Sequence, residues 1–196
     1  MLDMVGRARE YRLHSLSALI GNTPAIRILA RHDGHEVTIY AKAEMYNLSG
    51  SIKDRMALAI LEDAIRRGEL LPGQTIVEAT SGNSGISFAA IGSALGHPVT
   101  IFMPDWVSAE RRALLAGYGA DVRLISREAG GFLGCMAAAE ALGEQDAFLP
   151  RQFSNPVNAD EHADGTGPEL WQQVTDDGSE LGGFVAGVGT GGTVMG

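Results

Sequence analysis

The sequence has few cations, a single cysteine and no long apolar run, and each shortage excludes a class of protein. Only 15 of the 196 residues are lysine or arginine, against 24 acidic residues, which gives a formal net charge of −9. Nucleic acids and anionic membranes are bound by clustered cations, so we expect neither as a partner. No apolar run reaches the roughly 18 residues of a membrane-spanning helix, and no export signal is recognisable.

Few side chains offer redox, metal or hydrolase chemistry. Cys135 cannot form a disulfide within the chain, and it stands in an apolar stretch of helical pattern. We therefore expect a buried, unreactive thiol and a reducing, cytoplasmic location. The five histidines have no cysteine or carboxylate neighbours at ligand spacing, so no metal site is expected. The sequence also lacks a Gly-x-Ser-x-Gly elbow and a Walker loop.

Glycine is abundant, with 26 residues, and it clusters where short apolar runs end. These β-branched runs alternate with stretches of helical periodicity, which indicates an α/β fold whose parallel sheet has helices on both faces. Strands are expected at residues 37–42, 75–79, 99–103, 122–125 and 183–186. Helices are expected at about 52–67, 84–95, 108–117, 131–142 and 167–174, with Thr166 as the N-cap of the last.

Lys53 departs from the charge preference of a helix N-terminus in the direction that a catalytic amine requires, although most lysines are solvated surface groups. Ile52, Met56 and Ile60 recur every four residues and predict an amphipathic helix that ends at Gly68. Lys53 falls in its first turn, where the helix dipole disfavours a positive charge and lowers the pKa of the amine. A neutral amine is what nucleophilic attack on an aldehyde requires. The alternative is an ordinary solvated surface lysine.

Two glycine loops follow Lys53. Residues 80–85 (TSGNSG) stand between a strand and a helix, where free backbone N–H groups form an anion pocket. Ordinary turn and N-cap chemistry is the alternative for this loop. Residues 187–193 (GVGTGGT) satisfy the pattern of a dinucleotide-binding loop. That interpretation needs an acidic residue about 20 positions later, and the sequence ends first, so a simple phosphate cradle is favoured.

One amine and two anion loops fit a cofactor that carries an aldehyde and a phosphate and acts on a carboxylate-bearing substrate, as pyridoxal 5′-phosphate (PLP) does. Six motifs, taken in order, resemble the cysteine synthase and cystathionine β-synthase family of fold-type II, tryptophan synthase β-like PLP enzymes. The resemblance covers the chain from about Leu16. The motifs are residues 19–24 (LIGNTP), 50–55 (GSIKDR), 80–85 (TSGNSG), 152–156 (QFSNP), 166–169 (TGPE) and 189–193 (GTGGT).

The resemblance implies a role for each matching residue. Lys53 matches the lysine that binds PLP covalently and moves the α-proton of the substrate, and Asn83 matches the asparagine that hydrogen-bonds the ring hydroxyl of the cofactor. The residues that match the PLP phosphate cradle are Gly189, Thr190, Gly191, Gly192 and Thr193. The residues that match contacts to the substrate carboxylate are Thr80, Ser81, Gly82, Ser84 and Gln152.

The activity implied by the resemblance is β-replacement on an activated serine, such as O-acetylserine, with sulfide to form L-cysteine. Synthesis of cystathionine or of S-sulfocysteine on the same scaffold is the alternative, as is an inactive, truncated PLP-binding protein. Leu48 replaces a common proline of the family, and residues 127–134 depart from its usual sequence, so the leaving group and the nucleophile stay open. The family is usually homodimeric.

The resemblance also implies a division into domains. A small three-layer α/β domain is expected at residues 45–153, and residues 1–44 and 154–196 are expected to form an incomplete large domain. In the family the large domain continues with further strands and helices, which supply the hydroxyl that faces the pyridine nitrogen of PLP. We therefore expect a chain truncated at its C-terminus, with reduced stability as an isolated fragment.

Overall fold

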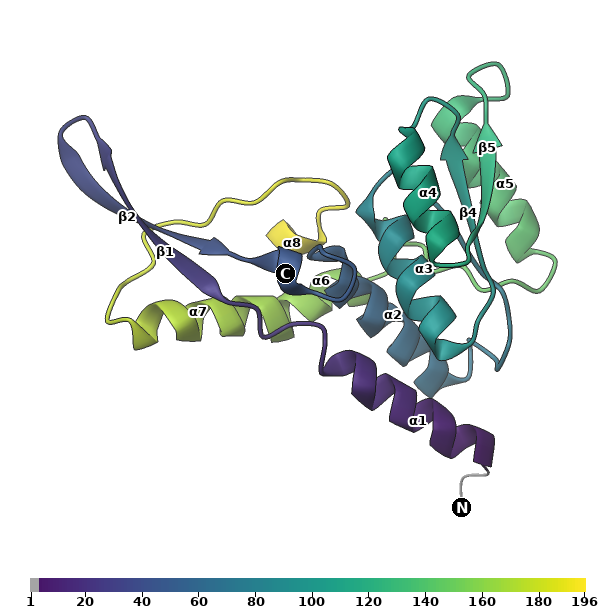
Figure 1. Ribbon diagram of the computed structural model, residues 1–196, viewed down its shortest axis with the longest axis horizontal. Coiled ribbons are helices and arrows are strands. Elements are labelled where there is room, and N and C mark those ends of the chain that lie inside the picture. The colour runs from purple at the N-terminus through teal and green to yellow at the C-terminus, as the bar shows by residue number, and fades with distance from the viewer. Residues whose placement is uncertain (1–3) are drawn as a thin grey trace.

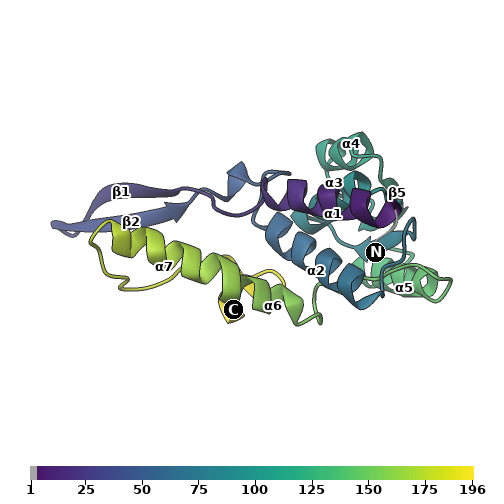
Figure 2. The same cartoon turned by 90° about the horizontal axis from the view of Figure 1, so that it is seen from below.

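The computed structural model describes residues 4–196 and shows an α/β unit beside an extended arm (Figure 1). The arm consists of an antiparallel hairpin, β1 (Ala25–His32) and β2 (His35–Lys42), with helix α7 (Gly167–Asp176) alongside it (Figure 2). The α/β unit comprises α2 (Lys53–Arg67), β3 (Ile76–Ala79), α3 (Asn83–Leu95), β4 (Val99–Pro104), α4 (Ala109–Gly117), β5 (Asp121–Ile125) and α5 (Gly131–Gly143). The remaining helices are α1 (Met4–Ser17), a 3-10 turn (Glu44–Tyr46), α6 (Val157–Glu161), a π-turn (His162–Thr166) and α8 (Gly192–Met195).

The sheet of the α/β unit is parallel, with strand order β3-β4-β5. Strands β3 and β4 are buried along their whole length, which explains why their sequences show no polar alternation. Ile76 and Ile101 belong to the core shared with α2 and α3, whereas Val77 and Phe102 pack with Cys135 of α5 on the opposite face. The predicted parallel sheet with helices on both faces is therefore confirmed.

Two glycines allow α3 to lie close to the sheet. A Cβ atom at Gly92 would stand 2.7 Å from Val99 Cγ2, and one at Gly85 would stand 2.7 Å from Thr80 Cγ2. Both distances are shorter than real Cβ contacts, so only glycine permits this packing. The close approach sets the position of the loop that joins β3 to α3.

Cys135 is fully buried, and burial raises the pKa of its thiol. A thiol held in its neutral form is a poor nucleophile, so the expectation of an unreactive core cysteine agrees with the structure. Among the described residues, no helix has both the length and the apolar character needed to span a bilayer.

The predicted strand at residues 183–186 is wrong. These residues are irregular, and Val185 is 97% exposed. A strand forms only where a neighbour supplies hydrogen-bond partners, and no strand within residues 4–196 pairs with this segment. Sequence reasoning also missed β1 and α1, the latter because its apolar residues do not form a clear stripe.

Thr166 directly precedes α7 at the predicted N-cap position, but its side chain forms no capping hydrogen bond within residues 4–196. Helical structure is already present from Val157 and runs through the π-turn into α7, so Thr166 has α-helical dihedral angles (φ −61°, ψ −43°). Its hydroxyl lies 2.9 Å from Nδ1 of His162. The π-turn adds one residue to a helical turn, a distortion that is frequent at functional sites.

A buried ion cluster ties the arm to the α/β unit. The side chain of Arg55 on α2 is 2% exposed, and it donates hydrogen bonds of 2.8–2.9 Å to Glu44 and Glu169. Glu169 also accepts hydrogen bonds from the backbone N–H groups of Asn22 and Thr23. Three of the sequence motifs, at residues 19–24, 50–55 and 166–169, therefore meet at one structural joint.

Candidate active site

Lys53 is the first residue of α2 and the one lysine whose ammonium is free of partners among residues 4–196. The chain has two lysines, and the ammonium of the other, Lys42, contacts Glu169 and lies 2.7 Å from the hydroxyl of Thr23. Burial lowers the pKa of Lys53, in the direction expected at a helix N-terminus. Lys53 is therefore the amine available for covalent chemistry.

The segment before Lys53 is held against α3. Asp54 is fully buried and accepts hydrogen bonds from the backbone N–H (2.6 Å) and the hydroxyl of Ser49. The Ser49 hydroxyl also lies 3.3 Å from that of Ser87 in α3. Leu48, which replaces the proline common in the family, packs against the main core. These contacts bring the start of α2 beside the first turns of α3.

The loop at residues 80–85 ends at the uncapped N-terminus of α3. Gly82 is the N-cap residue, and no side chain of residues 4–196 forms a capping hydrogen bond there. The hydroxyl of Thr80 accepts a hydrogen bond from the N–H of Gly82 (3.1 Å), and Arg111 of α4 donates to the carbonyl of Ser81 (2.7 Å). The first backbone N–H groups of α3 therefore lack a side-chain acceptor, which favours an anion site over ordinary capping.

The loop at residues 187–193 is shaped by Asn158 of α6. Gly191 has a φ of +90°, and a Cβ atom at Gly192 would stand 2.1 Å from Asn158 Oδ1, so both positions require glycine. Asn158 Nδ2 donates to the hydroxyl of Thr190 at 2.8 Å. Asn158 Oδ1 is buried and has no hydrogen-bond partner in the part of the chain that the structure describes. The Asn158 side chain therefore packs against the glycine loop through Nδ2, while its Oδ1 is an acceptor that a further donor could use.

His162 lies against this loop. Its Nε2 lies 3.2 Å from the hydroxyl of Thr193, and its side chain is buried. Burial lowers the pKa of His162 to about 4, and the charges of Lys53 and Arg55 contribute to the same shift. Lys53 begins α2, and the glycine loop leads into α8. Helix α6 packs against both α2 and α8 and so links these two elements.

Sequence reasoning missed Asn158 and His162. Both are buried polar residues, as is Thr166, and the three recur at intervals of four residues on one helical face. Polar residues that recur every four positions on the inward-facing side of a helix were the sequence signal that could have identified these two residues.

Gln152 lies beside the end of β3. Its backbone N–H approaches Glu78 Oε2 at 3.4 Å, and its carbonyl accepts a hydrogen bond from Asn158 Nδ2 at 2.9 Å. Gln152 therefore stands between the β3–α3 loop and the helix that shapes the glycine loop. No hydrogen bond in residues 4–196 joins the side chain of Asn83 or Gln152 to Lys53.

Glu78 makes this region sensitive to pH. Burial raises the pKa of Glu78 to about 7 from an ordinary value of 4.5, although backbone N–H groups oppose the shift. Because the folded state then holds a proton that the unfolded state has released, the free energy of unfolding falls as pH rises from about 4.5 to 7. We expect Glu78→Gln to remove this decline relative to the wild type, as measured by urea unfolding across that range. The exposed Glu36→Gln serves as control, and parallel profiles for the wild type and Glu78→Gln would contradict the prediction.

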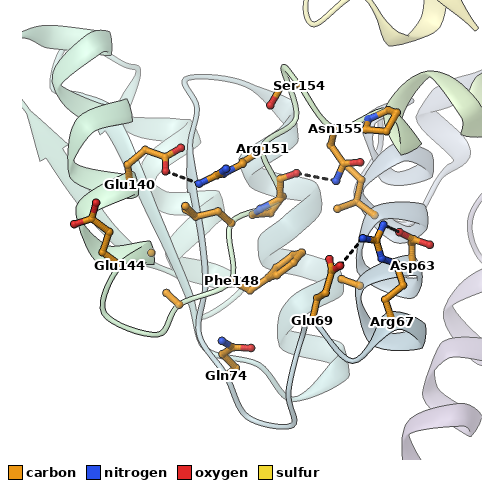
Figure 3. A pocket seen from close by; sticks show the side chains of 17 residues that line it. Asp63, Arg67, Glu69, Gln74, Glu140, Glu144, Phe148, Arg151, Ser154 and Asn155 are labelled. Carbon is orange, nitrogen blue, oxygen red and sulfur yellow. Dashed lines mark hydrogen bonds and ion pairs between the residues drawn. The ribbon is translucent and has the colours of Figure 1, made fainter.

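A separate pocket of about 630 Å³ lies between α2, α5 and residues 147–156, and none of the predicted site residues lines it (Figure 3). Its cations are neutralised locally. Arg67 pairs with Asp63 and Glu69, and Arg151 pairs with Glu140 at 2.7 Å. The residues predicted for chemistry gather instead around the starts of α2 and α3 and the glycine loop.

Comparison with known proteins places this geometry in a family. Residues 16–196 match the family model described as pyridoxal-phosphate dependent enzyme. Cysteine synthase from Staphylococcus aureus (strain N315) is 42% identical over 183 residues, which cover 93% of this chain and 58% of the relative. Cysteine synthase B from Escherichia coli (strain K12) is 39% identical over 184 residues, with 94% and 60% covered.

Comparison with solved structures supports the same family. A hydrogen sulfide-producing enzyme from Fusobacterium nucleatum superposes with a TM-score of 0.90 at 46% identity, over 95% of this chain and 56% of that one. An O-ureido-L-serine synthase superposes with a TM-score of 0.84 at 39% identity, over 91% and 56%. The chain thus spans less than two thirds of the length of these relatives, and the expected fold-type II architecture is confirmed over that span. The chain belongs to the pyridoxal-phosphate-dependent enzyme family.

Proposed function

We propose that this chain forms part of a PLP-dependent enzyme that replaces the β-substituent of an activated serine, such as O-acetylserine, with sulfide to form L-cysteine. The observation that carries the proposal is the placement of Lys53, an amine without a partner among residues 4–196, at the start of α2, which packs against α6 beside the glycine loop. Relatives named cysteine synthase and O-ureido-L-serine synthase support serine β-replacement as the reaction class.

The residues present fit PLP. Lys53 would hold the cofactor covalently, and Asn83, exposed at the start of α3, would face its ring hydroxyl. The phosphate would lie against the loop of Gly189, Thr190, Gly191, Gly192 and Thr193, where two hydroxyls and free backbone N–H groups are the appropriate donors. The absence of a Cβ atom at Gly192 leaves room for Asn158, which orients Thr190. Bound PLP supplies an electron sink for negative charge at the substrate α-carbon.

Different groups of the protein would then perform proton transfer and substrate binding. Burial lowers the pKa of Lys53 and favours its neutral amine, which can accept the proton from the substrate α-carbon and later return it. The uncapped start of α3 orients the substrate through its carboxylate. The residues proposed to bind that carboxylate are Thr80, Ser81, Gly82, Ser84 and Gln152.

The proposal includes an organisation for the whole enzyme. Residues 45–153 form the small domain, and the shared core of α2, α3 and the sheet supports this assignment. Residues 1–44 and 154–196 contribute to a large domain. A cytoplasmic homodimer is proposed on the family resemblance.

The test is to incubate the purified 196-residue chain with PLP, O-acetylserine and sulfide and to quantify cysteine. Formation of cysteine that depends on sulfide supports the proposal. Replacing sulfide with thiosulfate or homocysteine tests the two alternative products. Binding of PLP at Lys53 without any product would identify an inactive PLP-binding chain and contradict the proposed activity.

Gly192→Ala should weaken PLP binding. The new methyl group would overlap Asn158 Oδ1, 2.1 Å away, and would displace the loop that is proposed to hold the phosphate. Overpacking of this kind costs about 1–3 kcal/mol, so the dissociation constant for PLP should rise by roughly tenfold or more in an equilibrium titration. Gly182→Ala is the control, since nothing lies within 4 Å of a Cβ atom there. Equal affinities for the two variants would count against this cradle.

A further inference from the structure

A second pocket, of about 360 Å³, lies between α1 and the segments that follow α2 and α3. Three basic side chains line it, namely Arg9, Arg12 and His97. Its other lining residues are small or apolar, and none is acidic, although the chain as a whole carries a net charge of −9. The residues proposed to hold PLP and substrate do not line it. The pocket is therefore a concentration of positive charge separate from the candidate active site.

The two arginines have no carboxylate partners within residues 4–196. Arg9 Nη2 donates to the carbonyl of Leu70 at 2.9 Å, and Arg12 Nη1 donates to the carbonyl of Leu95 at 3.3 Å. Arg9 Nε is buried and has no hydrogen-bond acceptor among the described residues. In the pocket of Figure 3, by contrast, each arginine forms an ion pair with a carboxylate. Most donors of these two guanidinium groups are therefore available to a ligand.

His97 lies next to these donors and contacts one of them. The residue is 4% exposed, and its Nδ1 lies 2.9 Å from the carbonyl of Gln74, which can only accept. Nδ1 therefore carries the hydrogen, and in the neutral ring Nε2 accepts from Arg9 Nη2, 3.4 Å away. Burial lowers the pKa of His97, and the charge of Arg9 acts in the same direction. A bound anion would offset the Arg9 charge and favour the protonated ring.

We infer that this pocket binds an oxyanion of the sulfate or phosphate class, held by the guanidinium groups of Arg9 and Arg12, with His97 beside it. Guanidinium groups match the geometry of such anions, and charge-assisted hydrogen bonds are stronger than neutral ones. Because Arg9 and Arg12 come from α1 while His97 follows α3, the anion would connect the N-terminal helix to the α/β unit. The pocket volume accommodates either a free inorganic anion or the charged end of a small metabolite.

The test follows the ring resonances of His97 by NMR in the 196-residue chain during a titration with sodium sulfate. Sulfate is chosen because it does not titrate near neutral pH, and sodium chloride at equal ionic strength is the reference. We expect a saturable shift of the His97 resonances with sulfate and an upward shift of the His97 pKa at saturation. An unsaturable response, or the same response to chloride, would overturn the inference.

Variants separate this pocket from the proposed PLP cradle. Arg12→Gln should weaken sulfate binding by about tenfold or more, since a charge-assisted contact is lost. Arg66→Gln, at an exposed position of α2, and Thr190→Ala, in the glycine loop, should leave the His97 titration unchanged. Unaltered affinity in Arg12→Gln would overturn the proposal, whatever the fate of PLP binding. A parallel titration with glycerol phosphate distinguishes the two sources, because tighter binding than sulfate would indicate a metabolite.

Discussion

Lys53→Ala is expected to abolish covalent attachment of PLP to this chain. The sequence has only two lysines, and the ammonium of Lys42 is engaged by Glu169 and Thr23. Lys53 alone combines a lowered pKa with an ammonium that has no partner in residues 4–196. After borohydride reduction, peptide mass spectrometry should therefore find the cofactor on Lys53 in the wild type and nowhere in the variant. Any cysteine formation by the wild type should fall by at least about a thousandfold, since nucleophile and base are lost together.

Lys42→Arg is the matched control for this experiment. It keeps a cation beside Glu169 while removing the only other side-chain amine. The adduct should persist on Lys53 in this variant. A specific adduct at Lys42, or one that survives Lys53→Ala, would disprove the assignment of the cofactor lysine.

Arg55→Met is expected to lower the free energy of unfolding by about 3–5 kcal/mol, the range found when one member of a buried ion pair is removed. The Arg55 side chain is 2% exposed and neutralises two carboxylates, Glu44 and Glu169. Methionine fills a similar volume but leaves both carboxylates with less compensation. Chemical denaturation monitored by circular dichroism measures the difference, provided that the transition is cooperative.

The exposed Arg66→Met provides the control, with an expected change within about 0.5 kcal/mol, because the Arg66 side chain is 78% exposed. A loss below about 1 kcal/mol in Arg55→Met would show that the ion cluster contributes little to stability.

Acid titration is an independent test of how much the same ion cluster contributes to stability. Burial alone would raise the pKa of Glu169, but hydrogen bonds from Arg55 and Lys42 outweigh it and lower this pKa to about 2. The stability that Glu169 contributes is therefore present above its ordinary pKa of 4.5 and is lost as pH falls toward 2. In Arg55→Met this acid-induced loss should become smaller.

Local patterns were sufficient for the α/β unit. The four-residue recurrence in α2 and the glycine after it predicted that helix closely, and Gly68 has the left-handed conformation expected after a helix end, with a φ of +73°. Strands β3, β4 and β5 were predicted within one or two residues, because parallel strands such as the fully buried β3 and β4 appear as short β-branched runs. These features depend on neighbours a few positions away in the chain.

The missing strand and the missing capping hydrogen bond share a different cause. Residues 183–186 have the composition of a strand, yet strand formation requires a partner, and none lies beside them within residues 4–196. Thr166 has a side chain suited to an N-cap, but the helix that already precedes it removes the need for one. In both cases the deciding information lies outside the segment itself.

The sequence by itself indicated the α/β fold class, because turn glycines and helical periodicity are local properties, and its ordered motifs indicated the pyridoxal-phosphate-dependent family. Only the tertiary structure decided what surrounds them. Asn158 meets Thr190 across 32 positions, and Arg55 meets Glu169 across 114. The positive pocket likewise depends on how α1 packs against the loops after α2 and α3. Such contacts follow from packing between distant segments, which no local pattern encodes.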